Sequence, residues 1–187
     1  MRQTTLLVIC ALMAGLLATS AWASTAPPPA DTLKVDYFSN ANSAGAPDGT
    51  ARITNPGTSG GNIYAAIYVF DPNQEMSECC TCVETPDGLQ TLSVNGDLTA
   101  NPLTGVTLTT GLFKFVSTTG PSAAKLYPTP AIRAWVTHVQ NSNFSETETA
   151  SQDATLSSAE VTRLQNECNS ILLDGSGHGI CTCGTGE

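Results

Sequence analysis

The fold is decided by residues 62–70, which read Asn-Ile-Tyr-Ala-Ala-Ile-Tyr-Val-Phe. As a strand, this run has Tyr64, Ala66, Tyr68 and Phe70 on one face and Ile63, Ala65, Ile67 and Val69 on the other. Both faces are apolar, so both need cover from other parts of the chain. We therefore expect residues 62–70 to form a central strand of a β-sandwich, ended by the turn residues Asp71-Pro72-Asn73.

Other segments with the spacing of strands lie on both sides of this run. They are residues 33–38, 50–54, 106–117, 132–139 and 144–149. Residues 89–98 fit either a strand or a short helix, because a short apolar run does not separate the two. The polar segment 74–88 carries Cys79, Cys80 and Cys82.

Near its end the chain changes to helical spacing. Ser157 and Glu160 fit the first and last positions of a capping box. The apolar stripe that follows consists of Val161, Leu164, Cys168, Ile171 and Leu172. Gly175 is a typical C-terminal stop, so we predict a helix over about residues 158–174. It is followed by a glycine-rich tail with Cys181 and Cys183.

These patterns predict a mainly β protein: an immunoglobulin-like or related β-sandwich with one C-terminal α-helix, stabilised by disulfides. We assign residues 32–187 to a single domain. Residues 1–23 read as a cleaved signal peptide that includes Cys10, and residues 24–31 as a Pro-rich extended leader. The expected location is outside the cytoplasm, either secreted, on the cell surface or in the periplasm.

The chain of 187 residues is acidic, with a formal net charge of −9. Loss of Arg2 with the signal peptide changes this to −10, six basic against sixteen acidic residues. Such a charge disfavours nucleic acid and anionic lipid as partners. We expect no nucleic-acid partner, and no membrane contact after signal cleavage. The partners we expect are a second copy of the chain or another surface protein.

The cysteines of the mature chain form two groups almost a hundred residues apart. One group is Cys79, Cys80 and Cys82, and the other is Cys168, Cys181 and Cys183. In an oxidising compartment six cysteines predict three disulfides. Bridges between close neighbours within a group are cramped or strained. A Cys168–Cys181 bridge would leave only Cys183 for the first group, so two of its cysteines would stay free or form such a strained bridge. Oxidation of all six without strain therefore requires every bridge to join one group to the other, which leaves six pairings open.

A thiolate metal or redox site is the alternative use of these residues. Closely spaced cysteines suit soft ions such as Cu(I) or Zn(II), and the candidate ligands are Cys79, Cys80, Cys82, Cys181, Cys183 and His178. The spacing differs from that of zinc fingers, and the chain has no Cys-x-x-Cys-His for haem and no thioredoxin-like Cys-x-x-Cys. The disulfide interpretation is preferred, and the sequence implies no cofactor.

No catalytic constellation stands out. The chain has two histidines and no Gly-x-Ser-x-Gly elbow. Glu146 and Glu148 would share one face of a strand, where paired carboxylates can act as acid and base. On an edge strand rich in Thr and Ser they more often maintain solubility. His138 falls on a strand and is interpreted as structural.

Two segments resemble an uncharacterised family of secreted, cysteine-containing bacterial proteins. One is Cys79-Cys80-Thr81-Cys82 with the Thr85–Leu89 segment behind it, and the other is the tail from Leu156 to Cys181. The resemblance implies secretion from a bacterium and no known activity.

Export, β-richness and acidity together predict a secreted or cell-surface, non-enzymatic structural or adhesive protein, such as a subunit of an extracellular assembly or filament. The alternatives are an extracellular metal-binding or redox protein that uses the cysteines, and a carbohydrate-active enzyme that uses exposed loop carboxylates.

Overall fold

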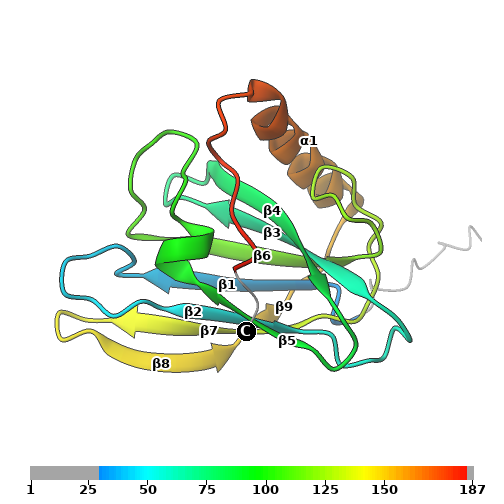
Figure 1. Ribbon diagram of the computed structural model, residues 1–187, viewed down its shortest axis with the longest axis horizontal. Helices are drawn as coiled ribbons and strands as arrows, with labels where there is room; N and C mark the ends of the chain where they lie inside the picture. Colours follow the sequence, from blue (N-terminus) through cyan, green and yellow to red (C-terminus); the bar gives the residue numbers. More distant parts are fainter. Residues whose placement is uncertain (1–29, 185–187) are drawn as a thin grey trace, which may run out of the picture.

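The computed structural model describes residues 30–184. Two antiparallel sheets pack face to face, and one helix near the C-terminus lies on the outer face of the larger sheet (Figure 1). This confirms the predicted class, a mainly β sandwich with one C-terminal helix. The predicted signal peptide, Cys10 and residues 24–29 of the leader lie outside the described residues.

The two sheets share the strands as follows. Sheet A has the order β4 (Met76–Glu84), β3 (Ile63–Phe70), β6 (Thr110–Thr118), β1 (Leu33–Ser39) and β9 (Gln152–Asp153). Sheet B has the order β5 (Leu89–Ser93), β2 (Thr50–Thr54), β7 (Arg133–Gln140) and β8 (Ser145–Ala150). The sandwich therefore has two open sides, one between the edge strands β4 and β5 and the other between β1 with β9 and β8.

Strand β3 is paired on both sides, by β4 and β6, as its two apolar faces predicted. Its odd-numbered residues Ile63, Ala65, Ile67 and Val69 belong to the core between the sheets. Ala66, Tyr68 and Phe70 belong to a second core on the other face of sheet A. Sheet A is thus the middle layer of three, between sheet B and the helix.

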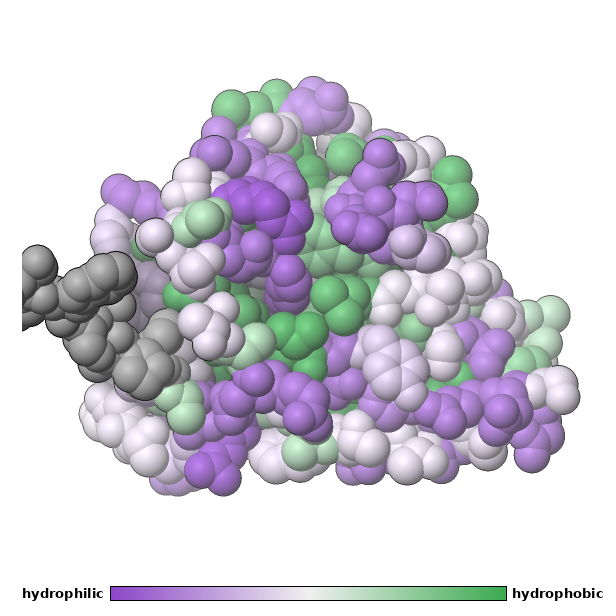
Figure 2. Space-filling view, turned by 180° about the vertical axis from the view of Figure 1, so that it is seen from behind, coloured by the Kyte–Doolittle hydropathy of each residue, from purple (hydrophilic) through white to green (hydrophobic). Residues whose placement is uncertain are grey.

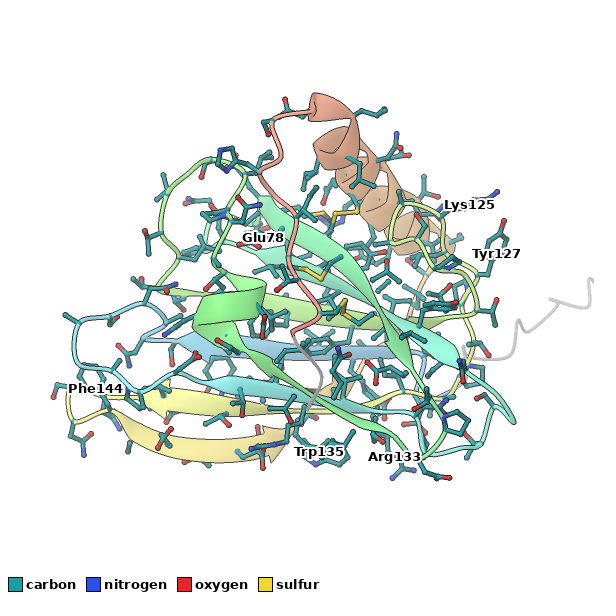
Figure 3. All side chains as sticks on the ribbon, in the orientation of Figure 1. Glu78, Lys125, Tyr127, Arg133, Trp135 and Phe144 are labelled. Carbon is teal, nitrogen blue, oxygen red and sulfur yellow. A yellow bond between two sulfur atoms is a disulfide. The ribbon has the colours of Figure 1, made fainter. Side chains whose placement is uncertain are left out.

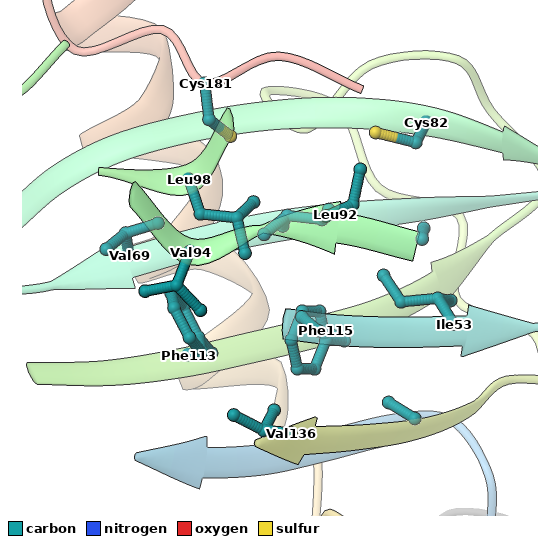
Figure 4. Close-up of a cluster of buried hydrophobic side chains, with 14 of the residues drawn as sticks. Ile53, Val69, Cys82, Leu92, Val94, Leu98, Phe113, Phe115, Val136 and Cys181 are labelled. Atoms are coloured by element: carbon teal, nitrogen blue, oxygen red, sulfur yellow. The ribbon is translucent and has the colours of Figure 1, made fainter. Parts of the chain in front are cut away.

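The core between the sheets is built around three phenylalanines. The ring of Phe113 stacks on Phe38 with centroids 4.6 Å apart and lies 5.8 Å from Phe115. Aliphatic side chains of sheet B close over them, and Cys82 and Cys181 belong to the same cluster (Figure 4). Two cysteines therefore lie inside the apolar core that the sheets bury.

Helix α1 (Ser158–Asp174) covers part of the outer face of sheet A. The Ser157 hydroxyl accepts a hydrogen bond from the amide of Glu160 at 3.1 Å, and the helix ends at Gly175, whose φ is 69°. These are the predicted cap and stop. The helix buries Leu164, Cys168 and Ile171. Among residues 30–184 no helix has the length and apolar character needed to cross a bilayer.

Several sequence-based assignments need correction. The polar segment 74–88 contains strand β4, and residues 89–98 form a strand, β5, followed by one π-helical turn, η1 (Val94–Leu98). The strand expected from residue 106 begins at Thr110, where its pairing with Ser39 of β1 starts. The strand expected from residue 144, β8, begins at Ser145, because Phe144 (φ 52°) closes the preceding turn. The apolar stripe predicted for the helix includes Leu172, but this side chain is 46% exposed.

The tight passage of β6 beside β1 and β3 gives a stability prediction. A Cβ at Gly111 would lie 2.2 Å from the backbone oxygen of Phe70 and 2.6 Å from the ring of Phe38. We expect Gly111→Ala to cost about 2–3 kcal/mol, since overpacking must shift backbone. Thermal denaturation should show a Tm lower by roughly 5–10 °C.

Gly61→Ala is the matched control, since its Cβ would meet nothing within 4 Å. A Gly111→Ala variant with the Tm of Gly61→Ala would contradict this packing.

Candidate functional site

The three cysteines of the first group lie on β4 and point to two different layers. Cys79 belongs to the core under α1, whereas Cys80 and Cys82 pack with the core between the sheets. This follows from the period of two along a strand. Successive side chains of a strand at the edge of sheet A can therefore reach both the helix and the segment that covers the open side.

Three disulfides join the two cysteine groups (Figure 3). They are Cys79–Cys168, Cys80–Cys181 and Cys82–Cys183, with Cα–Cα distances of 5.8, 5.2 and 5.4 Å. Each bridge joins one group to the other, and the pairing is one of the six that the sequence left open. The first bridge fastens the helix to β4, and the other two fasten the tail. Disulfides are typical of proteins in oxidising compartments.

The tail pairs with β4 as a parallel extension of sheet A. The Cys79 amide donates to the Gly179 carbonyl at 2.9 Å, and the Cys181 amide donates to the Cys79 carbonyl at 3.4 Å. On its other side the tail reaches sheet B. The Thr182 amide donates to the Asp97 carbonyl at 2.9 Å, and the Gln90 side chain donates to the Cys183 carbonyl. The tail thus closes much of the open side between β4 and β5 (Figure 1).

The residues of the metal alternative have other partners in this structure. Its five cysteines are all in disulfides and carry no thiol in the bridged protein. The Nδ1 of His178 lies 2.9 Å from the side-chain oxygen of Asn101. Across residues 30–184, no group of three or more His, Cys, Asp or Glu side chains is arranged to hold a metal ion.

Glu146 and Glu148 lie on the edge strand β8, whose six residues are all exposed. Glu148 forms an ion pair with Arg52 of β2, across strand β7, which lies between β8 and β2. The two carboxylates share one face of a strand, as expected from their spacing.

A polar cluster that the sequence did not reveal lies on the opposite side of the sandwich. It joins Asp36 of β1, His138 of β7, Thr149 of β8 and Ser151. The Nε2 of His138 is 3.3 Å from a carboxylate oxygen of Asp36 and 2.7 Å from the Thr149 hydroxyl. Ser151 donates to the other Asp36 oxygen at 2.8 Å. The side chains of Asp36 and His138 are only 8% and 3% exposed.

This cluster forms the floor of a slot of about 400 Å³ between β1 and β8. The slot exists because β9 pairs with β1 only at Lys34 and Val35, which leaves the rest of that edge uncovered. Its lining includes Val35, Tyr37, Gln140 and Gln152. Figure 2 shows the side opposite the tail, where apolar surface gathers in a central hollow with hydrophilic side chains around it.

The aromatic ring of Tyr37 is held rigidly in this slot. It stacks on the His138 ring with centroids 4.1 Å apart, and its hydroxyl accepts a hydrogen bond from Gln140. Tyr37 is nevertheless 44% exposed. The slot therefore presents an immobilised aromatic surface beside a carboxylate and two amides.

The geometry of the cluster differs from that of a nucleophilic triad. In a triad the carboxylate and the hydroxyl bond opposite nitrogens of the imidazole. Here Asp36 and Thr149 both contact Nε2 of His138, and its Nδ1 has no hydrogen-bond partner among the described residues. The cluster therefore does not have the arrangement of a nucleophilic triad, and Asp36, His138 and Thr149 line the slot.

Two further carboxyl groups, those of Glu78 and Glu84, are buried at opposite ends of β4. Their residues are 0% and 2% exposed. Burial raises the pKa of each from its ordinary value near 4.5 to about 8. In Glu78 this is opposed in part by the amide of Asn101, which donates to one carboxyl oxygen at 3.1 Å. Near neutral pH both groups are therefore largely protonated.

Comparison of the chain with protein-family models, with curated proteins and with solved structures gives no match. The resemblance to a family of secreted bacterial proteins stays a prediction.

The disulfides give a prediction about stability. With the other two bridges in place, Cys82–Cys183 closes only a short ring, so the variant with both residues changed to Ala should lose about 2 kcal/mol. Cys79–Cys168 closes a longer ring that includes the connection from helix to tail, and its removal should cost about 3 kcal/mol. Urea denaturation measures both values. Losses near zero for both variants would show that the two disulfides do not stabilise the folded protein.

The buried glutamates predict that the protein is more stable in mild acid. The pKa is higher in the folded than in the unfolded state, so this contribution is full below about pH 4.5 and is lost as pH rises towards 8. Each pKa unit corresponds to about 1.4 kcal/mol. We expect the free energy of unfolding to fall by a few kcal/mol from pH 5 to pH 8.

Urea titrations across that range test the expectation, with the double variant Glu78→Gln, Glu84→Gln as control. Asp153 and Glu160 do not interfere. Burial tends to raise the pKa of Glu160, but its ion pairs outweigh burial, and the pKa of Asp153 is lowered by its ion pair with Lys34, so both contributions are lost only in stronger acid. The variant should show a flatter profile, and an unchanged slope would show that the two carboxyls are hydrated.

Proposed function

We propose that the protein is a secreted or cell-surface, non-enzymatic adhesive protein that binds neutral carbohydrate in the slot between β1 and β8. The observation that carries this proposal is the exposed, rigid ring of Tyr37 beside the carboxylate of Asp36 and the amides of Gln140 and Gln152. Binding sites that combine an apolar surface with a few placed polar groups are typical of small-molecule recognition.

The Tyr37 ring supplies the apolar part of such a site. A sugar ring has a face of C–H groups that packs on an aromatic ring, and a tyrosine offers this area together with a polar tip. Stacking on His138 and the hydrogen bond from Gln140 hold Tyr37 in place before a ligand arrives. Such preorganisation reduces the entropy lost on binding.

The other lining groups suit hydroxyl ligands. An ionised carboxylate accepts hydrogen bonds, and each glutamine amide both donates and accepts. Thr147 and Thr149 add hydroxyls from β8. The net charge of −9 opposes acidic glycans by long-range repulsion. A neutral saccharide therefore fits the slot better than a sulfated or uronic polymer.

The disulfides support a location outside the cytoplasm. Secretion through the predicted signal peptide is part of the proposal. Association with further copies, as in a filament, stays a prediction.

Titration with neutral hexasaccharides of β-1,4-linked glucose, N-acetylglucosamine and mannose tests the proposal by calorimetry. We expect one of them to bind, and Tyr37→Ala to weaken its binding at least about tenfold through loss of the stacking surface. Tyr37→Phe keeps the ring and should retain most of the affinity.

Tyr127→Ala is the matched control, since Tyr127 is 51% exposed and lies in the loop between β6 and β7, outside the slot. Absence of binding across the panel, or an equal loss in Tyr37→Ala and Tyr127→Ala, would exclude this site.

A further inference from the structure

A second cavity lies on the tail side of the sandwich and has no role in the proposed carbohydrate site. It has a volume of about 480 Å³ and lies beside β4 and β5, where the described tail ends at Cys183 and Gly184. Its lining includes Tyr64, Glu84 and Gln90. The tail covers the open side of the sandwich up to this point, so the bridge between Cys82 and Cys183 completes one wall of the cavity.

Two residues that line this cavity, Glu84 and Gln90, each have a buried acceptor oxygen without a hydrogen-bond partner among the described residues. Glu84 pairs in register with Ile63, and Gln90 with Ile53. Both isoleucines belong to the core between the sheets, so Glu84 and Gln90 extend from the inner faces of the two sheets. Within residues 30–184, neither Oε1 of Glu84 nor Oε1 of Gln90 accepts a hydrogen bond.

The orientation of the Gln90 amide is fixed by the tail. Its Nε2 donates to the Cys183 carbonyl, so its oxygen is the atom left over. Buried acceptors without donors are rare and each costs about 1–3 kcal/mol. Both belong to residues that line one cavity, where a ligand with N–H donors would satisfy them.

We propose that this cavity binds a cationic amino or guanidino group, with Glu84 as its counter-ion and Gln90 as a second acceptor. A cation fits better than a neutral donor because no basic side chain lines the described part of the cavity. The six basic residues between positions 30 and 184 contact other groups: five form ion pairs with acidic side chains, and Lys125 lies over the Tyr127 ring. Glu84 has no such partner there.

The rim of the cavity suits the carbon chain of such a ligand. Val83 and Leu89 line the opening and are 52% and 58% exposed, and Pro121 adds further apolar surface. Aliphatic stems of amines pack along such surface while the charged end binds elsewhere. The cavity therefore offers an apolar entrance and a carboxyl group at depth.

The protonation of Glu84 gives this proposal a specific signature. Burial raises its pKa to about 8, so at neutral pH a cation must displace a proton from the carboxyl. Besides Glu84, the titratable group among the lining residues is Tyr64 of β3. Gln90 of β5 and the tail residues Cys183 and Gly184 present no titratable group to the cavity. Affinity should therefore rise with pH by up to about tenfold per unit below pH 8 and then level off.

Calorimetric titration of the full mature protein tests this with three probes: n-butylamine and the blocked peptides acetyl-Gly-Lys-Gly-amide and acetyl-Gly-Arg-Gly-amide. We expect binding that strengthens from pH 6 to pH 8, with proton release seen as a dependence on the ionisation enthalpy of the buffer. Tighter binding of a peptide than of butylamine would identify a protein side chain as the natural ligand, and equal binding a free amine. Both results support the site.

Glu84→Gln should weaken binding at least about tenfold at pH 8.5 and remove its pH dependence. Glu78→Gln is the control, because Glu78 is equally buried at the other end of β4 and should leave binding unchanged. The pH dependence of the unmodified protein tests the proposal even if Glu84→Gln does not fold. Absence of binding, binding without proton release, or equal losses in both variants would overturn it.

Discussion

An edge strand must have its free backbone groups paired or covered, and β4 meets this requirement through the C-terminal tail. The tail adds a parallel segment beside β4, and three disulfides hold it there. Because Cys82 and Cys181 lie within the core between the sheets, the same bridges also complete that core. Asn101 links the tail to β4. Its side-chain amide donates a hydrogen bond to the Gly177 carbonyl, its carbonyl accepts one from the Gly179 amide, and its backbone amide donates one to the Glu78 carboxyl group. The helix, the tail and the core between the two sheets are thus all connected to strand β4.

The two open sides of the sandwich are covered by different segments and to different extents, and one candidate site lies on each side. On the tail side the opening is covered up to Gly184, and a cavity with a buried carboxyl remains. On the other side β9 covers only the start of β1, where Lys34 is buried between Asp31 and Asp153 at 2.7 and 2.8 Å. The uncovered remainder is the slot with Tyr37 and His138. Each site therefore lies where cover of the sandwich ends.

The sequence predicted the features that depend on local pattern. The two apolar faces of residues 62–70 predicted a central strand, and Ser157 and Gly175 predicted both ends of the helix. Strand β4 was missed because its cysteines and glutamates read as polar, although bridging and burial make them interior residues. The sequence also did not indicate that Asp36 belongs to a candidate site. Alternation along β1 shows which residues share a face, but only the packing of β7 and β8 shows that His138 lies opposite. Neither cavity could be predicted, because each combines residues from strands distant in sequence.

The account depends most on the pairing of the six cysteines. The decisive measurement is fragmentation mass spectrometry of the unreduced protein, with electron-transfer dissociation to separate the bridges of adjacent Cys79 and Cys80. The structure predicts Cys79–Cys168, Cys80–Cys181 and Cys82–Cys183 in the full population. A bridge between Cys168 and Cys181, or any bridge within one group, would contradict the docking of the tail on β4.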